Sequence, residues 1–182
     1  MKNYNKLNLR KDSVYNLFFK IAIPSSIGTI FQTLYSIVDS IFAGKLISSL
    51  ALAAIGQTFP IYFIIIALWV GLSIGSTSLI SNHLGADEYV KASQYFSQSL
   101  LLSILVAVLV TFFGINYSDN IILYLNSNLE TLKLSTDYLN IVFLGSIFIF
   151  ILMSINSALS AQGDTKSYRN VLIFSFFLNI FL

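Results

Sequence analysis

Residues 55–84 read IGQTFPIYFIIIALWVGLSIGSTSLISNHL and contain no Lys, Arg, Asp or Glu. A helix of this length rises about 45 Å at 1.5 Å per residue, more than the ~30 Å hydrocarbon core of a bilayer. Two further charge-free stretches follow, at residues 92–118 and 138–163. The first stretch therefore predicts a membrane-spanning helix, and the later ones predict that it is one of several.

The composition of the whole chain agrees with this interpretation. Of its 182 residues, 56% are hydrophobic and 10% are charged, whereas soluble domains have about 45–50% apolar and about 25% charged residues. This balance excludes a cytosolic enzyme and a disordered tail. The net charge is +2, and the basic residues form no patch interleaved with aromatic residues, so no nucleic-acid partner is expected. The chain has no Cys, and no residue set indicates catalysis or a cofactor.

We expect an all-α, polytopic transmembrane helix bundle, with the lipid bilayer as its surroundings. A polar N-terminal segment at residues 1–13 precedes one membrane domain at residues 14–182. Complete spans are expected at residues 14–43, 55–84, 92–115 and 138–161, and a fifth segment at 168–182 is too short to cross. Residues 44–54 are expected to be a short connection. Residues 116–137 are expected to be a loop whose apolar side chains lie along the membrane surface.

The distribution of Lys and Arg predicts the orientation of these spans. With a cytoplasmic N-terminus, Lys45 and Lys133 alone fall outside, and eight basic residues fall inside: Lys2, Lys6, Arg10, Lys11, Lys20, Lys91, Lys166 and Arg169. Short cytoplasmic loops carry the excess of Lys and Arg in membrane proteins. Eight against two therefore supports the span count and predicts a multi-pass protein of the plasma (inner) membrane.

Asp39 lies inside the first expected span, where an ionised carboxylate costs about 2.5–3.5 kcal/mol on insertion scales. Polar and small residues recur on its helix face, whereas the opposite face is aliphatic; the polar set is Ser25, Gly28, Thr29, Gln32, Tyr35 and Ser36. We interpret Asp39 as a proton or cation site coupled to transport, since a carboxylate in a low dielectric can exchange a proton near neutral pH. The alternative is a carboxylate that reaches the outer interface or pairs permanently with Lys45.

Other polar or small residues within the spans have less specific interpretations. Gly71 and Gly75 form a GxxxG pair in the second span, which favours close helix packing. Gln57 is a candidate cavity-lining residue, and His83 is expected to be interfacial. Asn156 in the fourth span either bonds across helices or lines the pathway, and Asn179 lies in the incomplete fifth segment. Residues 116–118 read NYS, a weak match to a glycosylation acceptor.

Three separated motifs then resemble one family of transporters. They read IPSSIGTIFQTLYSIVDSIFAGKLISSLALAAIGQ from residue 23, GLSIGSTSLISNHLGADEYVKA from residue 71 and SALSAQGDTKSYRNVL from residue 157. Their order and content resemble the multidrug and toxic compound extrusion (MATE) family. That resemblance implies about twelve helices in two lobes, of which this chain is part of the N-lobe. It also implies export of cationic or amphiphilic drugs in exchange for protons or sodium ions by alternating access.

The resemblance also implies roles for particular residues. Asp39 matches the family's first-helix acid, and Asn179 is similar to an asparagine that helps to coordinate the coupling ion, so a sodium ion is expected near these two residues. Gln32, Tyr35, Ser36, Gln57 and Asn156 are the expected cavity-lining residues. Some relatives carry a second acid at the position that would follow Leu182. We therefore expect an N-terminal fragment whose partner is the remainder of the transporter chain.

Two other functions stay open. One is a truncated or non-transporting membrane protein, because four spans and part of a fifth do not form a two-lobed pore. The other is a lipid-linked oligosaccharide flippase of the same superfamily, whose cavity usually holds several basic residues; here the expected spans hold only Lys20. The DNA sequence beyond the Leu182 codon separates the fragment from the truncated product, and dye efflux under separate proton and sodium gradients identifies the coupling ion.

Overall fold

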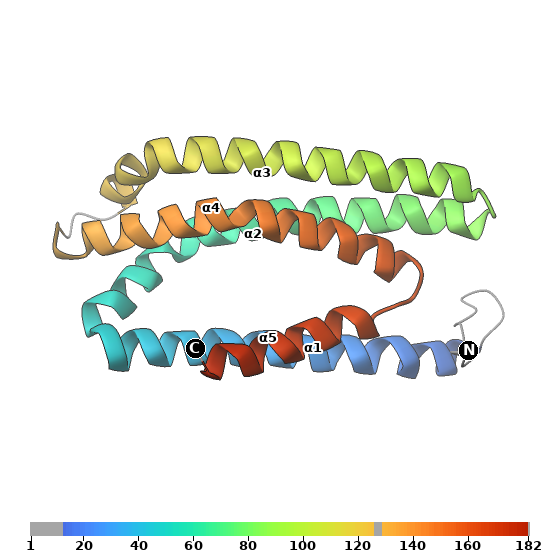
Figure 1. Cartoon of the computed structure of the whole chain (residues 1–182), viewed down its shortest axis with the longest axis horizontal. Coiled ribbons are helices and arrows are strands. Elements are labelled where there is room, and N and C mark those ends of the chain that lie inside the picture. The colour runs from blue at the N-terminus through green and yellow to red at the C-terminus, as the bar shows by residue number, and fades with distance from the viewer. Residues whose placement is uncertain (1–12, 126–128, 182) are drawn as a thin grey trace.

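The computed structural model describes residues 13–125 and 129–181 and is helical almost throughout. Its elements are α1 (Val14–Phe42), a π-helical turn η1 (Ala43–Ile47), α2 (Ser49–Gly85), α3 (Tyr89–Leu125), α4 (Leu129–Ala161) and α5 (Lys166–Phe181). Figure 1 shows these helices side by side along one long axis. The expected all-α fold class is confirmed.

Hydroxyl and carboxylate side chains fix where the helices begin. The Ser13 Oγ accepts a hydrogen bond from the Asn16 N–H at 3.3 Å, and the Ser48 Oγ accepts one from the Ala51 N–H at 3.1 Å. The Asp164 carboxylate accepts bonds from the Lys166 and Ser167 N–H groups, each at 3.1 Å. These N–H groups have no partner within their own helix, so each cap stabilises a helix start.

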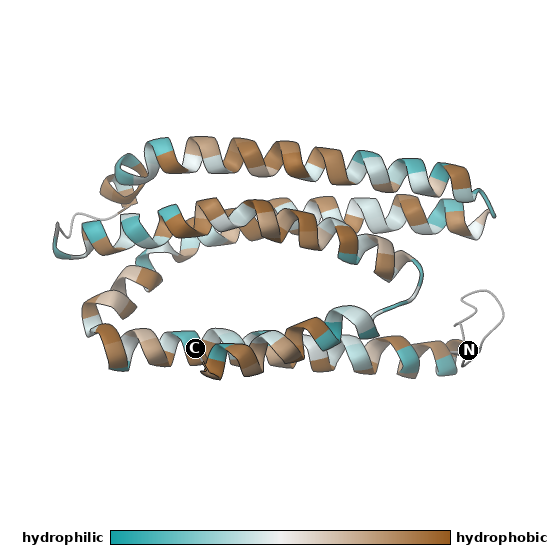
Figure 2. Cartoon of the chain, in the orientation of Figure 1, coloured by the Kyte–Doolittle hydropathy of each residue, from teal (hydrophilic) through white to brown (hydrophobic). Residues whose placement is uncertain are grey.

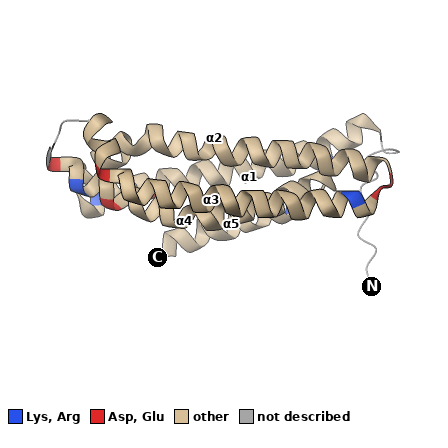
Figure 3. Cartoon of the chain, turned by 90° about the horizontal axis from the view of Figure 1, so that it is seen from above, with Lys and Arg blue, Asp and Glu red and all other residues tan. Residues whose placement is uncertain are grey.

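Four helices among the described residues have the length and composition to cross a membrane: Val14–Ile47, Ser49–Gly85, Tyr89–Leu125 and Glu130–Ala161. In α3 and α4, hydrophobic residues fill the middle and hydrophilic residues gather toward the ends, whereas α1 alternates hydrophobic and hydrophilic residues along much of its length (Figure 2). Lys, Arg, Asp and Glu follow the same pattern, because nearly all of them lie at the two ends of the bundle (Figure 3). The apolar middle is therefore the part that suits a hydrocarbon environment.

The helices form two packing groups. In one, α2, α3 and α4 contact each other; in the other, α5 lies along α1. The main core belongs to the first group and consists of Ile61, Ile65, Ala107, Ile122, Leu139, Phe143 and Phe150. A smaller core of Ile80, Ala92 and Ala161 closes the end near the α2–α3 turn.

The expected connections at residues 44–54 and 116–137 are mostly helix, which corrects the sequence interpretation. α2 already begins at Ser49, α3 continues to Leu125, and α4 begins at Leu129. Ile122 is 1% exposed and Leu132 packs against the same core, so these two residues lie inside the bundle instead of along the membrane surface, whereas Leu125 stays exposed. A 37-residue helix rises about 55 Å and so extends beyond the hydrocarbon, where polar residues are tolerated.

The packing expected for Gly71 and Gly75 is also wrong for the described part of the chain. Both glycines are exposed, and a Cβ atom added at either would have no neighbour within 4 Å. Close approaches occur instead at Gly28, whose added Cβ would lie 3.3 Å from the Leu172 Cδ1, and at Gly114, which lies against the Phe143 ring. Spacing alone does not show which face of a helix meets a neighbour.

Candidate functional site

The two residues expected at the ion site lie in direct contact. The Asn179 Nδ2 of α5 donates a hydrogen bond to the Asp39 Oδ1 of α1, with a distance of 2.7 Å. These residues are 140 positions apart in the sequence. The structure thus joins an acid of the first helix to an amide of the fifth helix.

Contacts along the α1–α5 seam set this pairing. The Thr165 hydroxyl reaches the Ile21 carbonyl at 3.5 Å, and Gly28 gives room for the α5 backbone at Arg169. Further along, Phe31 packs against Phe176, with ring centroids 5.3 Å apart. The two helices therefore run in the same direction, and the next turns bring Asp39 and Asn179 together.

The polar face of α1 costs little because its hydroxyl groups bond to the helix itself. The Ser36 Oγ donates to the Gln32 carbonyl at 3.3 Å, and the Ser40 Oγ donates to the Ser36 carbonyl at 2.9 Å. Gln32, Tyr35 and Ser36 are exposed, and Ser36 and Ser40 line an open groove of ≈ 560 Å³ beside η1. The expected cavity-lining residues of α1 are thus accessible on this helix.

Asp39 has no ion-pair partner in the described residues. The ion pairs there join Glu88 to His83 and to Lys91, so the permanent Asp39–Lys45 pair considered above is not formed. The Asn179 Oδ1 is buried and accepts no hydrogen bond from a described residue. A carboxylate beside an unused amide oxygen is a donor set that suits a proton or a hard cation.

Two tyrosines near this pair had not been singled out from the sequence. Tyr62 of α2 and Tyr138 of α4 lie close enough to Asp39 for its charge to act on their hydroxyl groups. Tyrosine is frequent at membrane interfaces, so nothing in the sequence distinguishes these two from the other eight of the ten. The electrostatic influence of Asp39 therefore reaches one tyrosine of α2 and one of α4.

Gln57 and Asn156 form no hydrogen bond with Asp39 or Asn179 in the described part of the chain; Gln57 bonds to α4 instead. The Gln57 Oε1 accepts hydrogen bonds from the Thr131 Oγ1 at 2.8 Å and the Ser135 Oγ at 3.1 Å, which joins α2 to α4. The Asn156 Oδ1 is buried and has no hydrogen-bond partner among the described residues. Their cavity-lining role stays a prediction.

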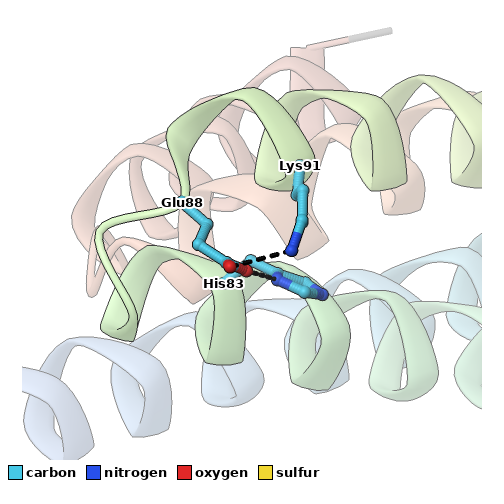
Figure 4. Close-up of polar contacts among 3 residues, drawn as sticks. All are labelled: His83, Glu88 and Lys91. Atoms are coloured by element: carbon cyan, nitrogen blue, oxygen red, sulfur yellow. Dashed lines mark hydrogen bonds and ion pairs between the residues drawn. The ribbon is translucent and has the colours of Figure 1, made fainter.

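His83 belongs to a polar cluster at the α2–α3 turn, shown in Figure 4. The Glu88 Oε2 lies 2.6 Å from the His83 Nδ1, and the Glu88 Oε1 lies 2.8 Å from the Lys91 Nζ. The His83 ring also stacks on Tyr95, with centroids 4.7 Å apart. The hydrogen bond from Lys91 and then that from His83 lower the pKa of Glu88 below its ordinary 4.5, so the carboxylate stays ionised at neutral pH. The described residues contain no group of three or more His, Cys, Asp or Glu that could hold a metal ion.

Together, these features define a polytopic helical membrane protein with an acid–amide pair between its first and fifth helices. The MatE family model matches residues 24–182, and the chain belongs to this family. The multidrug export protein MepA of Staphylococcus aureus (strain bovine RF122 / ET3-1) is 29% identical over 182 residues, which cover 100% of this chain and 40% of that protein. The chain thus spans about 40% of the length of such relatives.

Solved transporter structures share the arrangement of the helices. A multidrug resistance MATE family transporter of the MOP superfamily in an outward-facing conformation matches with a TM-score of 0.91 at 28% identity. A MOP superfamily transporter from Pyrococcus furiosus, whose reversed pocket polarity is said to suggest a different function, matches equally, with a TM-score of 0.91 at 28% identity. Each match covers 100% of this chain and 40% of the other.

Proposed function

We propose that this chain contributes the ion-coupling site of a multidrug efflux antiporter, which exports cationic or amphiphilic compounds in exchange for protons or sodium ions. The observation that carries the proposal is the 2.7 Å bond between Asn179 and Asp39. Family membership and the likeness to MepA, a multidrug export protein, support the transport activity.

The chemistry of the pair suits a site that gains and loses a cation. When Asp39 is ionised, it accepts the bond that the Asn179 Nδ2 donates. When Asp39 is protonated, its hydroxyl becomes a donor, and the Asn179 Oδ1 is the unused acceptor beside it. The amide can therefore satisfy both states of the carboxylate, which lowers the cost of switching between them.

A sodium ion would use the same oxygen atoms. The Asp39 carboxylate and the Asn179 Oδ1 are hard donors of the kind that alkali and alkaline-earth cations bind. Two side chains supply fewer oxygen atoms than such a cation takes, so sodium coupling requires further donors from water or from other residues. Proton coupling requires only the pair itself.

The first test is dye efflux from proteoliposomes that contain the protein expressed from its complete reading frame. Asp39→Asn removes the titratable group but keeps the shape, so we expect coupled efflux to fall at least tenfold, to the rate of empty vesicles. Proton and sodium gradients are imposed separately to identify the coupling ion. Asp119→Asn, an exposed acid near the end of α3, is the matched control. Unchanged efflux in Asp39→Asn would contradict the proposal.

A further inference from the structure

Three basic residues gather at one end of the α1–α5 seam. Lys166 begins α5, Arg169 lies one turn further along, and the Thr165–Ile21 hydrogen bond places this first turn of α5 beside Lys20 of α1. Lys20 lies four residues before the buried Pro24 and is itself half-buried, so it belongs to the side of α1 that meets α5. The three cations thus come from two helices and meet at one seam.

Few negative charges offset this group, which we name the seam cluster (Lys20, Lys166 and Arg169). None of its members forms an ion pair with a described acid. Asp164 is the acid beside them, and its two oxygens already accept bonds from Ser167 and from backbone N–H groups of the α5 start. Lys91, another described basic residue at this end, is instead paired with Glu88 at 2.8 Å. Among the described residues, one acid beside three cations leaves the seam cluster positive.

The guanidinium of Arg169 is held in place and still has donors to offer. Its Nε and Nη2 donate to the Asn170 Oδ1 at 3.2 and 2.8 Å. An arginine has five N–H groups in a planar fork, so three remain for a ligand with several acceptor oxygens. A phosphate group has that chemistry.

The seam cluster lies at the depth of lipid headgroups. The span Val14–Ile47 rises about 51 Å, so each of its ends extends about 10 Å beyond a ~30 Å hydrocarbon core. Lys20 is six residues, about 9 Å, from the helix start. Tyr15, Phe18 and Phe19 precede it, with exposed fractions of 75%, 62% and 42%. Exposed aromatic rings are typical of the membrane–water interface.

We propose that the seam cluster binds the phosphate of an anionic phospholipid, whose acyl chains run toward the middle of the span along the exposed aliphatic side chains of α1, such as Ile23 and Ile30. A free phosphate ion shares the chemistry of the headgroup, but only the lipid also uses the apolar surface beside the cations. The site is separate from the Asp39–Asn179 pair, because Lys20 lies 19 residues before Asp39 on the same helix. The proposal therefore does not rest on ion coupling or on transport.

The test measures lipid retention by native mass spectrometry of the protein expressed from its complete reading frame. Phosphatidylglycerol and phosphatidylcholine are added to the detergent-purified protein, and the bound fractions are compared. We expect the wild type to prefer phosphatidylglycerol and the triple variant Lys20→Gln, Lys166→Gln and Arg169→Gln to lose this preference, by about fivefold for each charge removed. Lys45→Gln, at the other end of the bundle, is the matched control. Equal phosphatidylglycerol retention in all three proteins overturns the proposal.

A charge-retaining variant, a change of salt concentration and competition with inorganic phosphate test the proposal further. The charge-retaining variant Lys20→Arg, Lys166→Arg and Arg169→Lys should keep the lipid preference, and its loss there would overturn an electrostatic site. Raising the salt of the wild type from about 0.1 M to about 1 M should weaken retention through screening, and an unchanged preference would contradict the proposal even if the neutral variant does not fold. Displacement of phosphatidylglycerol by inorganic phosphate at an equal concentration would also overturn the assignment to a lipid.

Discussion

Among the glycines of the main packing group, Gly114 of α3 has the closest contact with another helix. Its missing side chain makes room for the Phe143 ring of α4, and a Cβ atom there would overlap the ring carbons. Gly114→Ala should therefore lower the free energy of unfolding by about 1–3 kcal/mol, the usual cost of overpacking. Thermal unfolding in detergent measures the change. Gly71→Ala is the control, because an added Cβ there meets open space and a helical alanine is favoured over glycine by about 1 kcal/mol.

Gln57 carries the polar contact between α2 and α4. Gln57→Leu removes the acceptor of the Thr131 and Ser135 hydroxyl groups, both of which are buried. We expect this variant to lose about 1 kcal/mol of stability, because interhelical hydrogen bonds in membrane proteins average about 0.6 kcal/mol each. Gln57→Glu is not a suitable control, because it keeps an acceptor but adds a carboxylate to a membrane span. Equal unfolding midpoints for Gln57→Leu and the wild type would show that the two bonds contribute nothing.

At the scale of residues, the sequence identified the charged residue that is unfavourable in a membrane span, but it did not identify most of the residues that lie near it in the structure. Asp39 could be identified because an ionised carboxylate within an apolar span is energetically unfavourable. The resemblance to the MATE family then indicated Asn179 as the second residue of the same site. Tyr62 and Tyr138 could not be predicted in this way, since a tyrosine is common in membrane helices and its relation to Asp39 depends on how α2 and α4 pack. Gly71 and Gly75 had the expected spacing but face away from other described helices.

The α2–α3 turn is the element whose stability should depend on pH. The pKa of Glu88 is lowered first by the Lys91 hydrogen bond and then by the His83 hydrogen bond. A lowered folded-state pKa gives stability that is present above the ordinary value of 4.5 and is lost as the pH falls below it. We therefore expect the unfolding midpoint of the wild type to fall more steeply below pH 4.5 than that of Glu88→Gln. Parallel curves for the two proteins would contradict this role of Glu88.

At the scale of elements, the sequence predicted the apolar centres of the helices but not their ends. Charged and polar residues were taken to stop the spans near residues 115 and 138, whereas α3 and α4 continue past these points. Charged and polar residues therefore do not mark the helix ends, because a helix can continue beyond the hydrocarbon core into the aqueous region. Asn116, for example, bonds its own helix through the Phe112 carbonyl at 2.7 Å.

At the scale of the whole molecule, the basic residues that the structure describes are distributed unevenly between the two ends. Lys20, Lys91, Lys166 and Arg169 belong to the end that holds the α2–α3 turn and the start of α5, whereas Lys45 and Lys133 belong to the other end. This agrees with the prediction from the sequence that the protein lies in the plasma membrane with its N-terminus on the cytoplasmic side. Because the chain has no native Cys, single cysteines can report the orientation directly.

Ala86→Cys and Gln162→Cys lie in the two turns of the basic end, and Lys45→Cys lies at the opposite end. In intact cells, a membrane-impermeant maleimide should label Lys45→Cys and leave the other two unlabelled. Opening the cells should expose Ala86→Cys and Gln162→Cys. Labelling of either of these two in intact cells would reverse the proposed orientation.

The bond between Asp39 and Asn179 also has a consequence for synthesis. Asn179 follows Asp39 by 140 positions, which take roughly 7–28 s to translate at 5–20 residues per second. During that interval α5 has not been made. The Asp39 carboxylate of α1 therefore lies in the membrane or at the membrane surface without its hydrogen bond from Asn179. The Ser and Thr hydroxyl groups of this face already bond to their own helix during that time, whereas Asp39 depends on an amide that has not yet been synthesised.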